Sequence, residues 1–307
     1  MQKRFKDYFI ISIKGMAMGA ADVVPGVSGG TIAFISGIYE ELITSLNNIN
    51  ITLFKTLKNE GLKTAWNQLN GNFLTALFIG IGISVLSLAK GLEWVLHNHP
   101  ILIWSFFFGL VLASIVFIGK QITKWNLITI IGLIAGAFIA YYITTIPPLV
   151  SENTSNGFLF LAGALAICAM ILPGISGAFI LVLLGAYQPV LAALNNKDIK
   201  TIAIIGLGAI VGLLSFSKLL KWLFKNYHNL TLAILTGFIL GSLNKIWPWK
   251  KVLSFRTNSK GEQIPFLEES ISPFSFEGNN QLALAIGFMT LGFVTIFILE
   301  KLGSKKQ

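Results

Sequence analysis

Two five-residue segments interrupt the apolar sequence of this chain, and they are nearly identical. Residues 25–29 read Pro-Gly-Val-Ser-Gly, and residues 173–177 read Pro-Gly-Ile-Ser-Gly. A proline with two glycines breaks a helix, and non-helical backbone at membrane depth is tolerated only where protein buries it or where it lines a cavity. Matched breaks in two halves of a membrane protein are typical of a transport site. The breaks therefore predict a transporter.

The composition places both breaks in a membrane protein. Hydrophobic residues make up 54% of the chain and charged residues 12%, with a mean hydropathy of +0.74, whereas soluble domains carry about 25% charged residues. A membrane-crossing helix takes about 20 apolar residues. Two apolar blocks, about 8–46 and 158–195, contain the breaks, and further uncharged runs long enough or nearly long enough to span lie at 73–89, 101–119, 125–146, 201–217, 229–244 and 281–299.

The charged and reactive residues argue against several other classes of protein. The net charge is +10, but the lysines are scattered between apolar runs, so no nucleic-acid partner is expected. A single cysteine, Cys168, excludes an internal disulfide and a thiolate metal cluster, and we expect neither a metal nor a cofactor. Residues 26–30 match the Gly-x-Ser-x-Gly nucleophile motif, but the second copy ends in Ala178 and no Ser-His-Asp set is apparent. A serine hydrolase is therefore not expected.

Comparing the sequence with itself indicates a duplication. An offset of 148 aligns the two breaks, and an offset of 128 aligns the sequence that follows, so we expect two repeat halves, 1–157 and 158–307. The first half has 20 extra residues after Asn48, and this insertion, about 49–70, combines lysines with apolar residues as an interfacial helix does. The aligned pairs include Pro25 with Pro173, Gly37 with Gly185, Tyr39 with Tyr187, Gly80 with Gly208, Trp94 with Trp222 and Gly109 with Gly237.

The orientation of the halves depends on how the broken segments cross the bilayer. Residues 158–172 would form about 22 Å of helix, which is short of the roughly 30 Å hydrocarbon core, so we expect re-entrant hairpins. If both broken segments are hairpins, three full crossings remain in each half and the halves have opposite orientations. If each broken segment crosses once, each half has four crossings and the repeat is parallel. With hairpins, 15 of the 23 lysines and arginines lie inside, as the positive-inside rule requires. Both termini are then cytoplasmic, and a loop at about 246–280 is external.

The residues at the breaks suit an anion. Gly29, Gly30 and Gly177 leave backbone N–H groups available, and hydroxyl groups come from Ser28, Thr31 and Ser176. Helix N-termini and such nests of N–H groups bind anions. The alternative is that the glycines allow close helix packing and the serines bond to backbone carbonyls. Both interpretations remain open from the sequence.

Few charged residues lie near the breaks. Asp22 precedes the first break within an apolar run, where it either binds or relays a proton or serves as a structural partner for a lysine or for free N–H groups. Glu40 is a second candidate for proton coupling, although Glu40 and Glu41 end the first hairpin and are expected at the cytoplasmic interface. Lys14 and Lys218 could approach a bound anion, and we assign Lys218 to the substrate site.

Several segments of the chain together carry a resemblance to a known family: residues 15–33 with Gly37–Glu40, Pro173–Gly177 with Gly185–Tyr187, the stretch from Ser217–Leu220 to Gly241–Ser242, and Trp247–Trp249. In these segments the chain is similar to the PopT polyprenyl-phosphate transporters, formerly a family of unknown function. The resemblance covers nearly the whole length and departs mainly at about 250–280. It implies a prokaryotic cytoplasmic-membrane protein that returns undecaprenyl phosphate, the lipid carrier of cell-wall precursors, from the outer to the inner leaflet.

The implied substrate agrees with the chemistry of the breaks. A phosphomonoester carries a charge of about −1.5 to −2 and needs N–H and hydroxyl donors, while its prenyl tail can remain in the lipid beside the protein. A carrier for a small soluble anion is the first alternative, because it would use the same nest. A membrane lipid-phosphate enzyme is a weaker one, because Arg4 and Arg256 are the only arginines and neither lies in an apolar run. A structural protein would leave the breaks unexplained.

Overall fold

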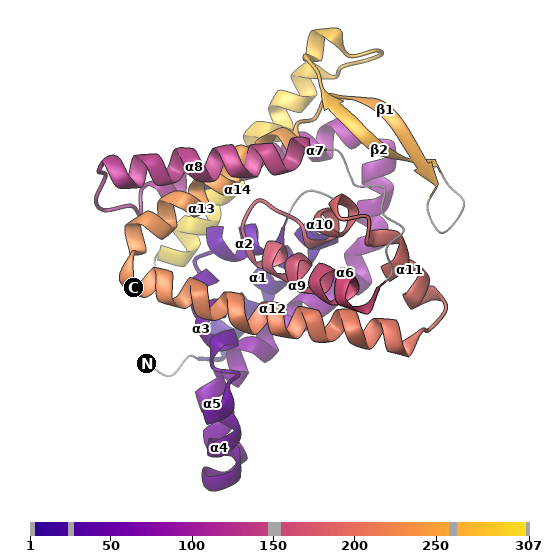
Figure 1. Ribbon diagram of the computed structural model, residues 1–307. Coiled ribbons are helices and arrows are strands. Elements are labelled where there is room, and N and C mark those ends of the chain that lie inside the picture. Colours follow the sequence, from indigo (N-terminus) through magenta and orange to yellow (C-terminus); the bar gives the residue numbers. More distant parts are fainter. Residues whose placement is uncertain (1–3, 24–27, 147–154, 258–262, 305–307) are drawn as a thin grey trace.

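The computed structural model describes residues 4–23, 28–146, 155–257 and 263–304, and it is mainly helical (Figure 1). This confirms the predicted helical membrane class. The helices are α1 Phe5–Val23, α2 Gly29–Ile35, α3 Tyr39–Asn47, α4 Ile51–Glu60, α5 Leu62–Leu69, α6 Gly71–Asn98, α7 Pro100–Gly119, α8 Leu127–Thr145, α9 Asn156–Ile171, α10 Gly177–Leu183, α11 Tyr187–Asn195, α12 Ile199–Asn226, α13 His228–Ser242 and α14 Leu282–Ser304, with short 3-10 turns η1 Leu243–Ile246 and η2 Pro273–Ser275.

Each uncharged run that the sequence singled out lies in its own helix, namely α6, α7, α8, α12, α13 and α14. Within the described residues, five helices are long and apolar enough to cross a membrane: α6, α7, α8, α12, and α13 extended to Ile246. In α14 the apolar stretch Leu282–Phe297 is shorter. The chain is therefore a polytopic membrane protein.

Local sequence fixes where several of these helices begin. Asn126 and Thr129 form a reciprocal capping box at the start of α8, in which each side chain accepts from the other residue's backbone N–H. The Asp198 carboxylate accepts from the Thr201 N–H at the start of α12, and Pro100 occupies the first turn of α7. Asn126, Thr129 and Asp198 satisfy N–H groups that a helix cannot bond internally, and Pro100 has no N–H group that needs a partner.

The two broken segments have the same local construction. In the first, α1 leads to the break, and α2 and α3 follow, separated at Gly37. In the second, α9 leads to the break, and α10 and α11 follow, separated at Gly185. Gly37 has φ +72° and Gly185 has φ +71°, a left-handed conformation that favours glycine. The helices α10 and α11 meet at 110°. Each returning arm is thus two short helices, where the sequence predicted one.

Helix packing repeats with the sequence duplication. Gly80 of α6 packs against the Ser12 carbonyl of α1, and Gly208 of α12 packs against the Phe160 carbonyl of α9. These four positions are related by the offsets 128 and 148 found in the sequence. The later helices pack across the sequence, because α7 packs on α14 and α8 packs on α13. Helices from before and after residue 157 therefore interlock.

The 49–70 insertion and the 246–280 loop lie at opposite ends of the molecule (Figure 1). The insertion forms α4 and α5, which project from the helical body and are separated at Gly61, where φ is +87°. The single interfacial helix expected here is thus two helices. Large apolar side chains on them are exposed, including Phe54 at 66% and Leu62 at 73%, as an interfacial location requires.

The loop at 246–280 contains a β-hairpin that the sequence analysis did not predict. Strand β1, Lys250–Thr257, pairs antiparallel with β2, Gln263–Ser270. Two tryptophans fix the base of the hairpin: Trp247 Nε1 donates to the Ile271 carbonyl and Trp249 Nε1 to the Asn280 carbonyl, both at 2.9 Å. Trp249 is almost fully buried, so the hairpin is anchored to the helical body.

Candidate functional site

The two breaks meet in the interior of the molecule. The Gly174 N–H of the second break donates to Thr31 Oγ1 of α2 at 2.8 Å. Ser28 Oγ donates to the Met170 carbonyl, near the end of α9, at 3.0 Å. Ser28 and Thr31 are each only 1% exposed. The structure therefore brings the predicted site residues of the first break onto the backbone of the second.

Side chains of the first break also bond the N-terminal end of α2. Ser28 Oγ accepts from the Gly30 N–H at 3.1 Å, and Asp22 Oδ1 accepts from the Gly29 N–H at 2.6 Å. Asp22 is the last polar residue of α1, so its carboxylate joins the two sides of the break. This is the structural partnership with free N–H groups that the sequence left open for Asp22.

The second break lacks that carboxylate. An offset of 148 places Met170 at the position of Asp22, and the Met170 side chain lies beside Gly177 as the Asp22 side chain lies beside Gly29. Ser176 makes no capping hydrogen bond to α10. Among the described residues, the first break therefore has a carboxylate beside its glycine and the second has a thioether, a difference that the separate motifs did not reveal.

Close backbone packing accounts for some of the glycines. A Cβ atom on Gly30 would lie 2.5 Å from the Ile171 carbonyl oxygen and 2.8 Å from that of Met170. A Cβ on Gly177 would lie 2.6 Å from the Ala166 carbonyl oxygen. Cβ atoms do not approach backbone oxygens this closely, so a side chain at either position would push the segments apart.

The remaining predicted residues lie away from the contact between the breaks. Lys14 Nζ donates to the Ser36 carbonyl at 2.6 Å, at the far end of α2. Lys218 is exposed on α12. Glu40 lies in the first turn of α3, where Oε1 is 3.7 Å from His228 Nδ1 and both side chains are about half exposed. With Lys221 and Lys225, Glu40 lines a cavity of about 250 Å³ where α3 crosses α12.

Two neighbouring lysines were not expected from the sequence to belong to the site, and one of them, Lys245, lies near the second break. Lys245 Nζ lies 4.9 Å from the centroid of the Phe179 ring, on α10. Lys250 Nζ donates to the Lys245 carbonyl at 2.8 Å and lies 3.4 Å from Glu268 Oε2. Burial lowers the pKa of Lys250, and the Glu268 carboxylate opposes that change. Lys245 and Lys250 lie on either side of the Trp-Pro-Trp segment at 247–249. Their closeness to this segment in the sequence is the signal that could have identified them.

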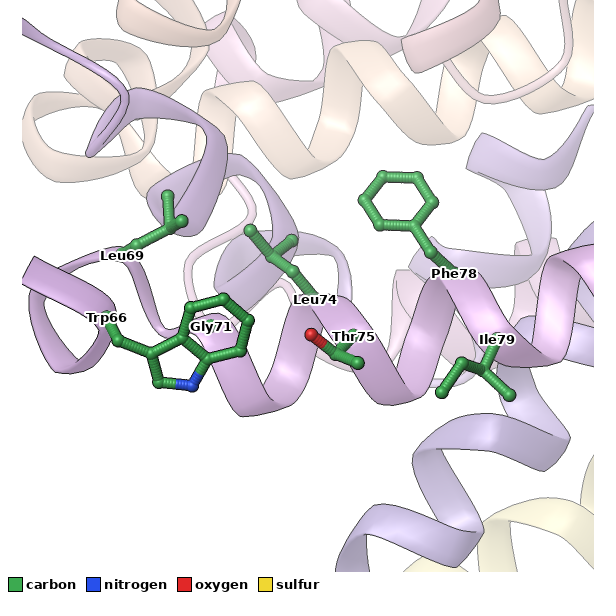
Figure 2. Close-up of a pocket in the computed structure, with 7 residues that line it drawn as sticks. All are labelled: Trp66, Leu69, Gly71, Leu74, Thr75, Phe78 and Ile79. Carbon is green, nitrogen blue, oxygen red and sulfur yellow. The ribbon is translucent and has the colours of Figure 1, made fainter. Parts of the chain in front are cut away.

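A separate cavity of about 470 Å³ lies where α5 meets α6 (Figure 2). Figure 2 shows the Trp66 ring beside Gly71, and Trp66 Nε1 donates to Asn72 Oδ1 at 2.8 Å. Thr75 provides a hydroxyl, but no charged side chain lines this cavity. It is therefore suited to an apolar chain rather than to an anion.

Comparison with known proteins agrees with this architecture. The model of a family described as undecaprenyl phosphate translocase-like matches residues 18–264. The chain belongs to this family. It is 49% identical to a polyprenyl-phosphate transporter of Vibrio cholerae over 99% of this chain and 100% of that protein. It is 31% identical to a polyprenyl-phosphate transporter of Staphylococcus aureus over 77% of this chain and 85% of that protein.

No solved structure matches the chain. The family and the names of both relatives indicate a transporter and not an enzyme. The transporter class expected from the paired breaks is thereby confirmed, as is the resemblance that the motifs carried.

Proposed function

We propose that this protein returns undecaprenyl phosphate from the outer to the inner leaflet of a prokaryotic cytoplasmic membrane. The description of its family names that lipid, and two relatives, which match 99% and 77% of this chain, are named as polyprenyl-phosphate transporters. The observation that carries the proposal is the contact between the breaks, where Gly174 bonds Thr31 across the two repeat halves. Transport sites of repeat proteins lie where broken helices meet.

In this proposal the phosphate head group passes along the breaks while the prenyl tail stays in the lipid. The head group is the costly part to move, because a charge in the bilayer core is poorly solvated. The N–H groups of Gly29, Gly30 and Gly177 and the hydroxyls of Ser28, Thr31 and Ser176 would replace its hydration. A phosphate oxygen that takes the Gly29 N–H displaces the Asp22 carboxylate, since that N–H is bonded to Asp22.

Proton coupling is a further part of the proposal. Displaced from Gly29, the Asp22 carboxylate would sit in apolar surroundings beside an anion, and both conditions favour its protonated form. Return of Asp22 to Gly29 would release the proton with the phosphate. Glu40, near Lys221 and Lys225, would accept that proton, and Lys218 of α12 would contact the head group as it leaves.

The proposed topology is an inverted repeat with re-entrant broken segments. The repeated packing of α1 on α6 and of α9 on α12 supports two equivalent units. The insertion at one end and the hairpin at the other match an internal 49–70 segment and an external 246–280 loop (Figure 1). Alternating access would then follow from rocking of one unit against the other.

Proteoliposomes containing labelled undecaprenyl phosphate test this function. A water-soluble phosphatase added outside removes only head groups in the outer leaflet, so an active transporter lets it reach the whole lipid pool. Empty vesicles and vesicles with Gly177→Val protein should protect the inner-leaflet lipid. Wild-type protein that protects it equally, while taking up labelled inorganic phosphate, would instead identify a carrier for a soluble anion.

A further inference from the structure

Two lysines at the base of the β-hairpin supply more positive charge than their surroundings neutralise. Lys250 of β1 is 11% exposed and Glu268 of β2 is 26% exposed, and their charged atoms lie 3.4 Å apart. Lys245 of η1 belongs to the same cluster, because its carbonyl accepts from Lys250 Nζ. Its positive charge lowers the pKa of Lys250 further. Glu268 can offset one of these two charges, which leaves one in excess.

The excess charge belongs to Lys245. Lys250 has a carbonyl, a carboxylate and the Trp104 ring, whose centroid lies 4.5 Å from its Nζ. The described residues offer Lys245 Nζ the Phe179 ring and the charge of Glu268 at longer range, but no hydrogen bond and no ion pair within 4 Å. An ammonium group has three N–H donors, and leaving such donors unpaired in a partly buried place is costly. An anionic oxygen would satisfy them.

The position of Lys245 connects the hairpin to the second break. Gly174, with φ +89°, packs against Ser242 Oγ and the Phe238 carbonyl at the end of α13. The turn η1 follows directly, and its Lys245 lies over Phe179, two residues after Gly177 in α10. A group bound at Lys245 would therefore be next to the second break and on the same end of the molecule as the hairpin.

A cavity of about 420 Å³ is lined by Asn244, the neighbour of Lys245 in the chain, and by Ser270, the strand partner of Lys250. Asn244, Ser270 and Ser272 give it polar edges, and its remaining wall consists of Phe108, Leu243, Trp247 and Ile271. A free phosphate ion gains nothing from an apolar wall. The first isoprene units of a prenyl chain would cover it and remove that surface from water.

We propose that Lys245, supported by Lys250, binds the phosphomonoester head group of a prenyl phosphate before the head group reaches the breaks. This inference rests on the proposed function, because the topology proposed above places the hairpin on the outer side of the membrane. Phe179 and Trp104 hold the two ammonium groups in position, and Glu268 prevents Lys250 from repelling its neighbour. The site is present in the second half alone, since offsets of 128 place Phe117 and Ile122 at these positions.

Binding to the detergent-solubilised full-length protein tests the site, with farnesyl phosphate, farnesol and inorganic phosphate as probes. Lys245→Met should weaken binding of farnesyl phosphate at least about tenfold, as expected for losing a charge-assisted hydrogen bond. Lys245→Arg should retain most of the affinity. Lys251→Met is the matched control, because Lys251 follows Lys250 on β1 but has an exposed side chain. It should bind like the wild type.

A second variant separates binding from stability. Lys250→Met with Glu268→Gln removes the ion pair without leaving a lone carboxylate, and it should weaken binding with little change in thermal unfolding. Farnesol binding should be unaffected throughout, because it has no phosphate.

The outcomes distinguish this site from the proposed function. Unchanged farnesyl phosphate binding by a folded Lys245→Met protein would overturn the site, and normal lipid transport by that variant would leave the function standing. If wild-type protein binds inorganic phosphate as tightly as farnesyl phosphate, and Lys245→Met weakens both, the phosphate site stands and the lipid function fails. Absence of phosphate binding by the wild type overturns the site.

Discussion

The backbone N–H of Gly29 donates a 2.6 Å hydrogen bond to the carboxylate of Asp22, across the break that separates α1 from α2. The carboxylate thereby occupies a position at a helix start where N–H groups attract anions. At the second break Met170 takes the corresponding position, beside Gly177. One break therefore contains its own anion and the other does not. This asymmetry suggests that substrate binding and carboxylate release are coupled at the first break.

Asp22→Asn and Asp22→Ala should differ in their effect on stability but have the same effect on proton-coupled transport. Asparagine keeps an oxygen that can accept from Gly29, so the variant should insert and unfold nearly as the wild type does. Alanine loses the acceptor and should cost about 0.5–2 kcal/mol. Both should lose transport driven by an imposed pH gradient, because neither can bind a proton. Thermal unfolding, expression level and lipid return in proteoliposomes measure these effects. Normal gradient-driven transport by Asp22→Asn would limit Asp22 to a structural role.

Ser28→Ala should be more harmful than Ser176→Ala. Ser28 Oγ donates to the Met170 carbonyl and accepts from the Gly30 N–H, in a place that is almost fully buried. Its removal leaves a buried N–H and a partly buried carbonyl without that partner, at a cost of about 1–3 kcal/mol. Ser176 makes no corresponding cap, so its loss should change unfolding little. Equal destabilisation by the two variants would mean that the breaks are energetically equivalent despite their different contacts.

A side chain at Gly30 should separate the two broken segments, and one at Gly177 should separate α10 from α9 within the second segment. Gly30→Ala forces a methyl group against the carbonyls of Ile171 and Met170, and such overpacking costs about 1–3 kcal/mol. Valine at Gly30 or Gly177 should abolish transport. At Gly29 the nearest atoms belong to the Asp22 side chain, which can rotate, so Gly29→Ala should be milder than Gly30→Ala.

Gly206 provides the matched control for these glycines. It lies within α12, and an added Cβ atom would meet nothing within 4 Å. Gly206→Ala should therefore leave transport unchanged and, because alanine favours helix over glycine, raise stability by up to about 1 kcal/mol. A loss of transport in Gly206→Ala equal to that in Gly30→Ala would show that packing at the breaks is not what the substitutions test.

Much of the architecture follows from sequence pattern because apolar runs and helix breakers act locally. The uncharged runs became helices, and the aligned Gly37 and Gly185 share one left-handed conformation. The packing of α7 on α14 and of α8 on α13 could not be predicted, because it depends on contacts between distant segments. The β-hairpin was overlooked because Lys250–Thr257 lies in a loop with many polar residues, and strand pairing is itself a tertiary interaction.

The chemical site was predictable to a smaller extent. Pattern alone selected Ser28 and Thr31, which the structure joins to the second break. It did not select Lys245 or Lys250, because a lysine next to tryptophan in sequence is usually an exposed interfacial residue. Burial of these lysines against Phe179 and Trp104 depends on helices far away in the chain.

Labelling with a membrane-impermeant thiol reagent tests the orientation of the two ends. In a protein in which Cys168 is replaced by alanine, Glu269→Cys on β2 should react from outside and Lys58→Cys on α4 should react only after the membrane is opened. Both residues are exposed, so accessibility depends on the side of the membrane and not on burial. The reverse pattern would place the hairpin inside and overturn the inverted-repeat topology. It would also turn the Lys245 site toward the cytoplasm, where it could release the head group but could not capture it.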